Sequence, residues 1–85
     1  MIDGMPGYHV KDIPRGVLGT ASKITEEALE FQDAIDQGCR VMAIQELADL
    51  YGAMQAYLMQ FNLTMSDLAR MSDVTTRAFQ SGRRK

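Results

Sequence analysis

The chain has 85 residues, a length that fits one small domain with a limited hydrophobic core. Its hydrophobic content of 46% and charged content of 24% are those of a globular protein and exclude a disordered chain. The net charge of −2 disfavours non-specific nucleic-acid binding, and the single cysteine excludes an internal disulfide and fits a reducing cytoplasm. No apolar run approaches the roughly 18 residues that a membrane-spanning helix needs, and the N-terminus lacks the apolar region of a signal peptide. We therefore expect a soluble cytoplasmic protein that binds no membrane.

The first 19 residues form a segment rich in glycine and proline. Four of the seven glycines and both prolines lie here. This density is typical of loops, so we predict an extended arm over residues 1–19. The only histidine of the chain, His9, lies in this arm, where a lone loop histidine is expected to be solvated rather than functional.

The next segment has helical periodicity over residues 20–37. Thr20 or Ser22 is the expected N-cap, and Gly38 occupies the position of a C-terminal glycine in the left-handed conformation. Four apolar residues spaced three or four apart form a stripe that we expect to be buried: Ile24, Ala28, Phe31 and Ile35.

Acidic residues border the apolar stripe of this first helix. At about 100° per residue, Glu27, Glu30 and Lys23 fall along one edge of the stripe. Glu26 and Asp33 fall farther round the helix and are expected to be more exposed. This placement makes Glu27 and Glu30 candidate metal ligands and makes Glu26 a candidate for orienting or deprotonating water.

A second helix is predicted over residues 40–61. Its expected buried face consists of apolar residues at three- and four-residue steps: Ala43, Leu47, Leu50, Met54 and Leu58. Glu46 and Asp49 border this face. Gly52, which lies among several alanines, predicts a tight crossing with another helix, since a glycine inside a helix costs about 1 kcal/mol that a close contact would offset.

A third helix is predicted over residues 65–80. Thr64 is a good N-cap, and Asp67 three residues later completes a variant of the capping box. The chain ends on Arg83-Arg84-Lys85, which is either a solvated tail or, like Arg77, a phosphate contact. We predict a single all-α domain over residues 1–85. Two apolar faces on so short a chain predict completion of the bundle in a homodimer or homotetramer.

The two predicted acidic pairs have the same spacing. Glu27 and Glu30 are surface neighbours on one helix, as are Glu46 and Asp49 on the next. A turn at Gly38 makes the two helices antiparallel and brings the pairs face to face. Four carboxylates without matching cations repel one another, and oxygen ligands suit Mg²⁺ or Mn²⁺. The alternative is an ordinary solvated helix face.

The acidic residues also follow a family signature. They occur in the order Lys23-Ile-x-Glu26-Glu27-x-x-Glu30 and then Glu46-Leu-x-Asp49. This order resembles the EExxE…ExxD signature of the all-α nucleoside triphosphate pyrophosphohydrolases. That superfamily includes MazG-like enzymes, dimeric dUTPases, dCTP pyrophosphatases and phosphoribosyl-ATP pyrophosphohydrolases. The match covers the central half of the chain, and the short Gly/Pro-rich N-terminus resembles the small MazG-like proteins of bacteriophages.

The resemblance implies a Mg²⁺-dependent hydrolase that converts a nucleoside triphosphate to the monophosphate and pyrophosphate. Carried over by motif position, the metal ligands are Glu27, Glu30, Glu46 and Asp49. Glu26 matches the additional acidic position, and Lys23 is a candidate for holding a phosphate.

The chain also departs from the family pattern. The family usually has a helix before the first motif that helps to form the nucleoside pocket, and residues 1–16 are not expected to supply one. A neighbouring subunit is therefore a candidate source of the pocket. The alternatives are a phosphoribosyl-ATP pyrophosphohydrolase and a helical interaction module without catalytic activity.

Overall fold

The computed structural model describes the backbone of residues 9–80 and the side chains of residues 9–76. This part of the chain contains three helices and no strand: α1 (Ala21–Asp36), α2 (Arg40–Met59) and α3 (Met65–Gln80). The prediction of an all-α fold with three helices is confirmed. The helix bounds differ from the prediction by one residue at each end of α1 and by two residues at the end of α2.

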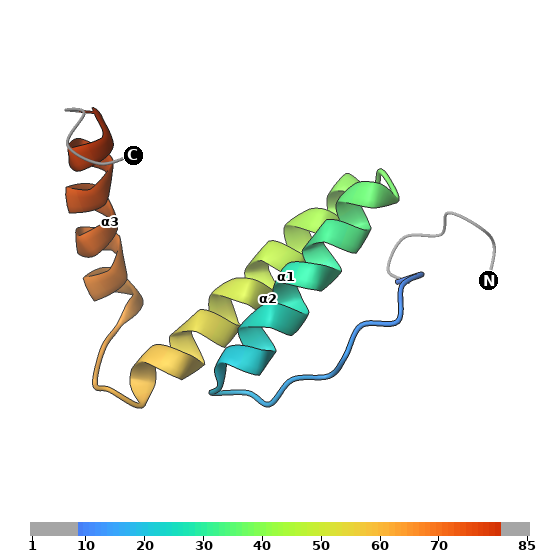
Figure 1. The fold of residues 1–85 in the computed structure, drawn as a ribbon, viewed down its shortest axis with the longest axis horizontal. Coiled ribbons are helices and arrows are strands. Elements are labelled where there is room, and N and C mark those ends of the chain that lie inside the picture. The colour runs from blue at the N-terminus through green and yellow to red at the C-terminus, as the bar shows by residue number, and fades with distance from the viewer. Residues whose placement is uncertain (1–8, 81–85) are drawn as a thin grey trace.

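A tight turn folds α1 and α2 into an antiparallel hairpin (Figure 1). Gly38 has a φ of 72°, which is the left-handed conformation that the sequence predicts for it. The amide of Gly38 donates to the carbonyl of Ile35 at 2.9 Å, and the amide of Cys39 donates to Ala34 at 3.1 Å. These bonds satisfy the last carbonyls of α1 and place the start of α2 beside its end.

The end of α2 is set by Asn62. This residue has a φ of 57°, and the amide of Leu63 donates to the carbonyl of Leu58 at 3.1 Å. Asparagine tolerates the left-handed conformation better than most residues, so it ends the helix in the way a glycine would. The apolar pattern continues to Phe61 and therefore predicts a helix that is two residues too long.

Side-chain capping differs between α1 and α3. Thr20 occupies the N-cap position of α1, but its hydroxyl donates to the carbonyl of Val17 instead of capping the helix. At α3, the amide of Thr64 donates to Asp67 Oδ2 at 2.8 Å, and the amide of Asp67 donates to Thr64 Oγ1 at 3.2 Å. The predicted capping box is therefore confirmed for α3. Thr20 is confirmed as the N-cap residue of α1, although its side chain makes no capping hydrogen bond.

The face that α1 buries is its acidic edge. Its buried residues are Glu26, Glu27, Asp33 and Ala34. Of the predicted buried stripe, Ala28 and Ile35 are exposed, while Ile24 and Phe31 are half-buried. Relative to the prediction the helix is turned by roughly a third of a revolution about its axis, as the positions of these residues on a helical wheel show. The expectation that Glu26 and Asp33 are exposed is wrong.

Helix α2 is displaced in the same sense but by less. Its buried residues are Met42, Ala43, Glu46 and Ala53. Of the predicted face, Ala43 is therefore buried as expected, and Leu50, Met54 and Leu58 are half-buried. Leu47 is exposed, although it lies in the middle of the predicted apolar face. A Cβ atom at Gly52 would have nothing within 4 Å, so the predicted tight helix crossing at Gly52 does not occur among the described residues.

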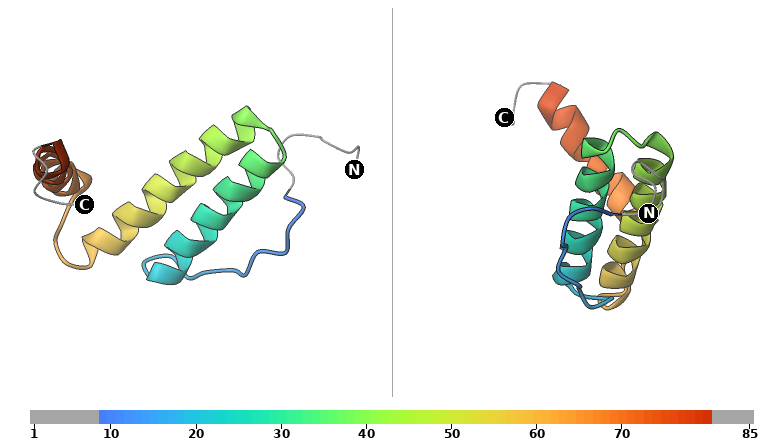
Figure 2. Two further views of the ribbon diagram at one scale, coloured as in Figure 1. Left: turned by 45° about the horizontal axis from the view of Figure 1, so that its top comes forward. Right: turned by 90° about the vertical axis from the view of Figure 1, so that its right-hand side faces the viewer.

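Residues 9–19 contain no helix or strand and run alongside α1 (Figures 1 and 2). Val10 and Gly16 donate backbone hydrogen bonds to carboxylates of α1, and Lys11 forms an ion pair with Asp36 at 2.5 Å. The segment passes so close to the start of α1 at Gly16 that a Cβ atom would collide with the carbonyl of Ser22. The arm is therefore attached to α1 at several points.

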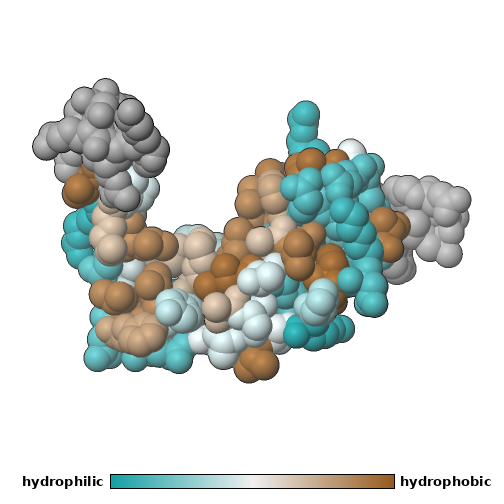
Figure 3. All heavy atoms as spheres, in the orientation of Figure 1, coloured by the Kyte–Doolittle hydropathy of each residue, from teal (hydrophilic) through white to brown (hydrophobic). Residues whose placement is uncertain are grey.

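The third helix stands away from the hairpin (Figure 2). Among the described residues α3 contacts α2 and makes no contact with α1. The radius of gyration is 15.6 Å, whereas a compact chain of this length has a value of roughly 12 Å. Figure 3 shows apolar side chains on the surface of both the hairpin and α3. In the described part of the chain, no helix combines the length and apolar character required to cross a membrane.

Candidate metal centre

The hairpin brings the two acidic motifs together. Glu26, Glu27 and Glu30 from α1 each offer a carboxylate oxygen, and these oxygens lie within 4.8 Å of one another. Oxygens of Glu27, Glu46 and Asp49 form a second such group across the two helices. We refer to these five residues as the acidic cluster. All the metal-ligand candidates from the sequence belong to it.

Two carboxylates of the acidic cluster are buried without full hydrogen bonding. The side chains of Glu27 and Glu46 are only 6% and 8% exposed. The Oε1 atom of each is buried and has no hydrogen-bond partner among the described residues. A buried carboxylate oxygen without a partner is costly and rare in folded proteins. A cation held between these oxygens would satisfy both.

Lys23 neutralises only part of this negative charge. Its Nζ atom lies 2.9 Å from Glu27 Oε2 and 3.2 Å from Glu26 Oε1. The hydrogen bond with Glu27 raises the pKa of Lys23, which therefore carries a positive charge at neutral pH. One ammonium group beside five carboxylates leaves a strong excess of negative charge.

Glu26 is held by the arm. Its Oε1 accepts a hydrogen bond of 2.7 Å from the amide of Gly16, and its side chain is 5% exposed. This backbone hydrogen bond, together with Lys23, lowers the pKa of Glu26. The arm covers the side of α1 that the helical wheel assigns to solvent, which explains why the predicted exposure of Glu26 is wrong.

His9 is a functional candidate that the sequence did not reveal. Its Nδ1 lies 2.8 Å from Asp33 Oδ2, and its Nε2 lies 2.8 Å from Glu46 Oε2 and 3.8 Å from Glu30 Oε1. The prediction of a solvated loop histidine is wrong. The contacts span 24 and 37 residues of sequence, so no local pattern could have indicated them.

Asp33 anchors the histidine. It is 0% exposed, and its Oδ2 also accepts hydrogen bonds from the Val10 amide at 3.1 Å and from Gln37 Nε2 at 3.0 Å. Although burial opposes ionisation, the hydrogen bonds from His9, Val10 and Gln37 lower the pKa of Asp33. Asp33 lies three residues after Glu30, as Glu30 lies three residues after Glu27. This regular spacing is the feature of the sequence that could have placed Asp33 beside these two residues.

The cluster shifts the ionisation of its own members. Burial, followed by the negative charges of Glu27 and Glu46, raises the pKa of Glu30. Burial also raises the pKa of Glu46, with Asp49 and Glu27 adding to it and His9 opposing it. Burial lowers the pKa of His9, but its hydrogen bonds to Glu46 and Asp33 outweigh burial and leave that pKa raised. Such shifts are characteristic of functional sites.

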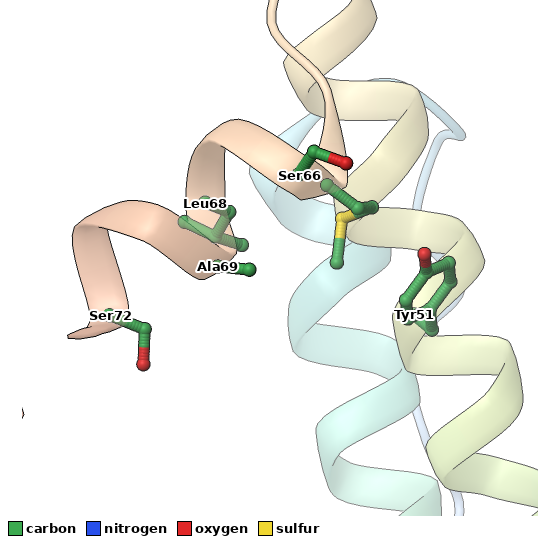
Figure 4. A pocket seen from close by; sticks show the side chains of 6 residues that line it. Tyr51, Ser66, Leu68, Ala69 and Ser72 are labelled. Atoms are coloured by element: carbon green, nitrogen blue, oxygen red, sulfur yellow. The ribbon is translucent and has the colours of Figure 1, made fainter.

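An open groove of about 510 Å³ lies beside the acidic cluster. Lys23, Glu27 and Asp49 line its charged end, and Leu18 and small residues such as Ala48 and Gly52 line the rest. A different groove, of about 470 Å³, lies between Tyr51 of α2 and the first turns of α3 (Figure 4). No carboxylate lines this second groove, so the groove at Lys23 suits an anionic ligand on a cation better.

The remaining basic candidates are at the C-terminal end of the chain. The side chain of Arg77 and the residues Arg83-Arg84-Lys85 lie outside the described residues. Comparisons of the chain with protein-family models, with curated proteins and with solved structures find no match.

Proposed function

We propose that the protein is a nucleoside triphosphate pyrophosphohydrolase that requires a divalent cation, Mg²⁺ or Mn²⁺. The proposal combines the signature shared with the all-α nucleoside triphosphate pyrophosphohydrolases and the geometry of the acidic cluster. The observation that carries it is the pair of buried carboxylates, Glu27 and Glu46, each with an unpartnered oxygen beside Asp49. Hard oxygen donors in this number suit Mg²⁺ or Mn²⁺.

Glu27, Glu46 and Asp49 are the residues that would hold a cation across the hairpin, with Glu30 beside them. A cation there supplies charge neutralisation for the phosphate oxygens of a triphosphate. Lys23 lies at the charged end of the groove, where its ammonium group can hold a phosphate oxygen. The substrate therefore approaches along the groove of small residues on α2.

Hydrolysis between the α- and β-phosphates also requires an oriented water and an acceptor for its proton. Glu26 fits this role because its lowered pKa keeps it ionised and because Gly16 and Lys23 fix its Oε1. Attack of the water on the α-phosphorus forms one P–O bond and breaks the bond to the β-phosphate oxygen. Pyrophosphate leaves, and the proton passes to the carboxylate.

An ion-exchange product assay tests the proposal. The chain is incubated with each common nucleoside and deoxynucleoside triphosphate and with Mg²⁺ or Mn²⁺, and the products are separated by charge. We expect monophosphate and pyrophosphate in equal amounts, and loss of both products in Asp49→Asn. Asp73→Asn, which removes the same charge from α3, is the matched control and should retain full activity.

Two other results would redirect the proposal. Cleavage of phosphoribosyl-ATP in preference to every triphosphate would assign the chain to the related pyrophosphohydrolases that share the signature. No cleavage of any substrate by either the wild type or Asp73→Asn would favour a helical interaction module. The exposed apolar residues of α2 and α3 suit that alternative.

A further inference from the structure

The arm brings the only histidine of the chain to the edge of the acidic cluster. The two ring nitrogens of His9 have different surroundings. Nδ1 faces the fully buried carboxylate of Asp33, and Nε2 faces Glu46 and Glu30. The ring thus lies between an anchoring acid and two acids of the cluster.

Asp33 fixes the orientation of this ring. Because Oδ2 of Asp33 is held by Val10 and Gln37 as well, it is an immobile acceptor for a proton on Nδ1 of His9. While the ring is protonated, both nitrogens donate to carboxylates. A cation that displaces the proton of Nε2 leaves the Nδ1 proton hydrogen-bonded to Asp33 and meets the Nε2 lone pair at the edge of the acidic cluster. Histidines that ligate metals in proteins almost always use this arrangement, with the other ring nitrogen bonded to a carboxylate or carbonyl.

The separations suit a cation. An octahedral ion with ligands at roughly 2.1 Å places neighbouring ligand atoms about 3 Å apart and opposite ones about 4.2 Å apart. Nε2 lies 2.8 Å from Glu46 Oε2 and 3.8 Å from Glu30 Oε1, and both distances are close to this range. Glu46, whose side chain is nine-tenths buried, would join the two positions: its Oε2 faces His9, and its Oε1 has no hydrogen-bond partner among the described residues.

We propose that His9, positioned by Asp33, is a nitrogen ligand of a second cation position that it forms with Glu30 and Glu46. This inference rests on the proposed function, because Glu46 also belongs to the carboxylate group with Glu27 and Asp49. A nitrogen ligand changes the cation preference: imidazole suits transition metals, whereas Mg²⁺ is bound by oxygen. The second position therefore selects Mn²⁺ over Mg²⁺.

Pulsed electron paramagnetic resonance of bound Mn²⁺ tests the nitrogen ligand directly. In untagged protein, an imidazole nitrogen coupled to Mn²⁺ can come only from His9, because the chain has one histidine. We expect this coupling in the wild type and its loss in His9→Gln. The wild-type spectrum needs no variant, so the test stands even if a substitution disturbs folding.

Calorimetric titrations with Mn²⁺ and with Mg²⁺ measure how much more tightly the protein binds Mn²⁺ than Mg²⁺. Loss of a residue that hydrogen-bonds to a metal ligand typically weakens metal binding by roughly 10- to 100-fold. Removal of His9, a ligand itself, should weaken Mn²⁺ binding by at least as much and should leave Mg²⁺ binding nearly unchanged. Asp33→Asn should weaken Mn²⁺ binding by about 10-fold and diminish the nitrogen coupling. Lys11→Ala is the matched control. Lys11 lies two residues after His9 and forms an ion pair with Asp36 at the end of α1, so this variant changes the arm without changing the proposed ligands and should behave like the wild type.

Two outcomes separate this inference from the proposed function. If Mn²⁺ binds without nitrogen coupling and His9→Gln keeps the wild-type ratio of affinities, the nitrogen ligand is wrong while the carboxylate site stands. If neither cation binds the wild type, both the second position and the proposed function are wrong.

Discussion

At the scale of single residues, the site carries more negative than positive charge. Five carboxylates of the acidic cluster meet Lys23 on one side and His9 on the other. Ionisation of Glu30 and Glu46 is disfavoured, as the raised pKa of each shows. Repulsion between these carboxylates therefore destabilises the folded chain when no cation is bound. Binding of a cation, or removal of one carboxylate charge, would reduce this repulsion.

Glu30→Gln should raise the melting temperature of the metal-free protein and weaken its response to Mg²⁺. Relief of each kcal/mol of repulsion corresponds to roughly 4–8 °C in a domain of this size. The wild type, in contrast, should gain stability from millimolar Mg²⁺ through mass action. Thermal unfolding with and without Mg²⁺ checks both expectations, and identical melting of the two proteins under both conditions would contradict them.

Glu26→Gln should separate catalysis from cation binding. The amide keeps an oxygen that can accept from Gly16 but loses the charge needed to take a proton. We expect a strongly reduced kcat with Mg²⁺ affinity within a few-fold of the wild type. Steady-state kinetics beside a Mg²⁺ titration measures this. Loss of the cation as complete as in Glu27→Gln would instead make Glu26 a ligand, as its position within 4.8 Å of Glu27 and Glu30 also permits.

The residues of the acidic cluster could be found from the sequence, because their three-residue spacing on two neighbouring helices is a local property. The part played by His9 could not. Its position depends on the path of residues 9–19 over α1, and that path is fixed by contacts such as Gly16 with Glu26 and Val10 with Asp33. Contacts between distant segments leave no periodic signal in the arm.

At the scale of elements, the packing of α1 follows its charges rather than its apolar stripe. The helical wheel orders the residues round the helix correctly. The wheel does not say which side of α1 contacts α2 and the arm, because an apolar stripe can be buried against another subunit as well as within the chain. Ile35 and Leu47 are 49% and 42% exposed as a result. The helices were thus predictable, and their rotation was not.

The path of the arm depends on Gly16. A Cβ atom there would collide with backbone atoms of Ser22 and Lys23, which cannot move without distorting α1. Gly16→Ala should therefore displace the arm, break the hydrogen bond to Glu26 and cost about 1–3 kcal/mol. Denaturant unfolding measures the cost, and faster proteolysis of the arm reports its release.

Gly52→Ala is the matched control for that substitution. A Cβ at Gly52 meets open space within the chain, so alanine should stabilise α2 by about 0.5–1 kcal/mol. If Gly16→Ala is as stable as the wild type, the arm does not lie against α1 as described. A large loss in Gly52→Ala would place that glycine in a tight contact between subunits.

The capping box should make α3 sensitive to acid. The hydrogen bonds from Thr64 lower the pKa of Asp67 below its ordinary value of 3.8. The contribution of ionised Asp67 to the stability of α3 is therefore fully present above pH 3.8. It is lost as the pH falls through the lowered pKa that Asp67 has in the folded chain. Thr64→Ala should cost about 1 kcal/mol at neutral pH. Amide hydrogen exchange of α3 measures both effects, and unchanged exchange in the variant would contradict the cap.

At the scale of the whole molecule, the chain is more extended than a compact domain of its length. On the helical wheel, the apolar stripes of α1 and α2 are displaced in the same sense from the contact between the helices. In antiparallel helices such a displacement places both stripes on the same outer side of the hairpin. This side forms an apolar surface suited to a second copy of the chain.

We predict a homodimer or homotetramer in solution. Leu47→Glu places a charge on the apolar surface of the hairpin and should shift the assembly toward monomer, whereas Gln55→Glu at another exposed position of α2 should not. Sedimentation velocity at micromolar concentration checks this. A wild type that sediments as a stable monomer would contradict the prediction, and with it a nucleoside pocket shared between subunits.

On the proposed function, the two acidic motifs hold a cation between α1 and α2. Calorimetric titration of the wild type, Glu27→Gln and Asp73→Asn with Mg²⁺ measures this binding. We expect saturable binding by the wild type and Asp73→Asn. Binding by Glu27→Gln should be at least about tenfold weaker, because a residue that ligates the cation matters at least as much as the residues that support it. Equal Mg²⁺ binding by all three proteins, or none by the wild type, would contradict it.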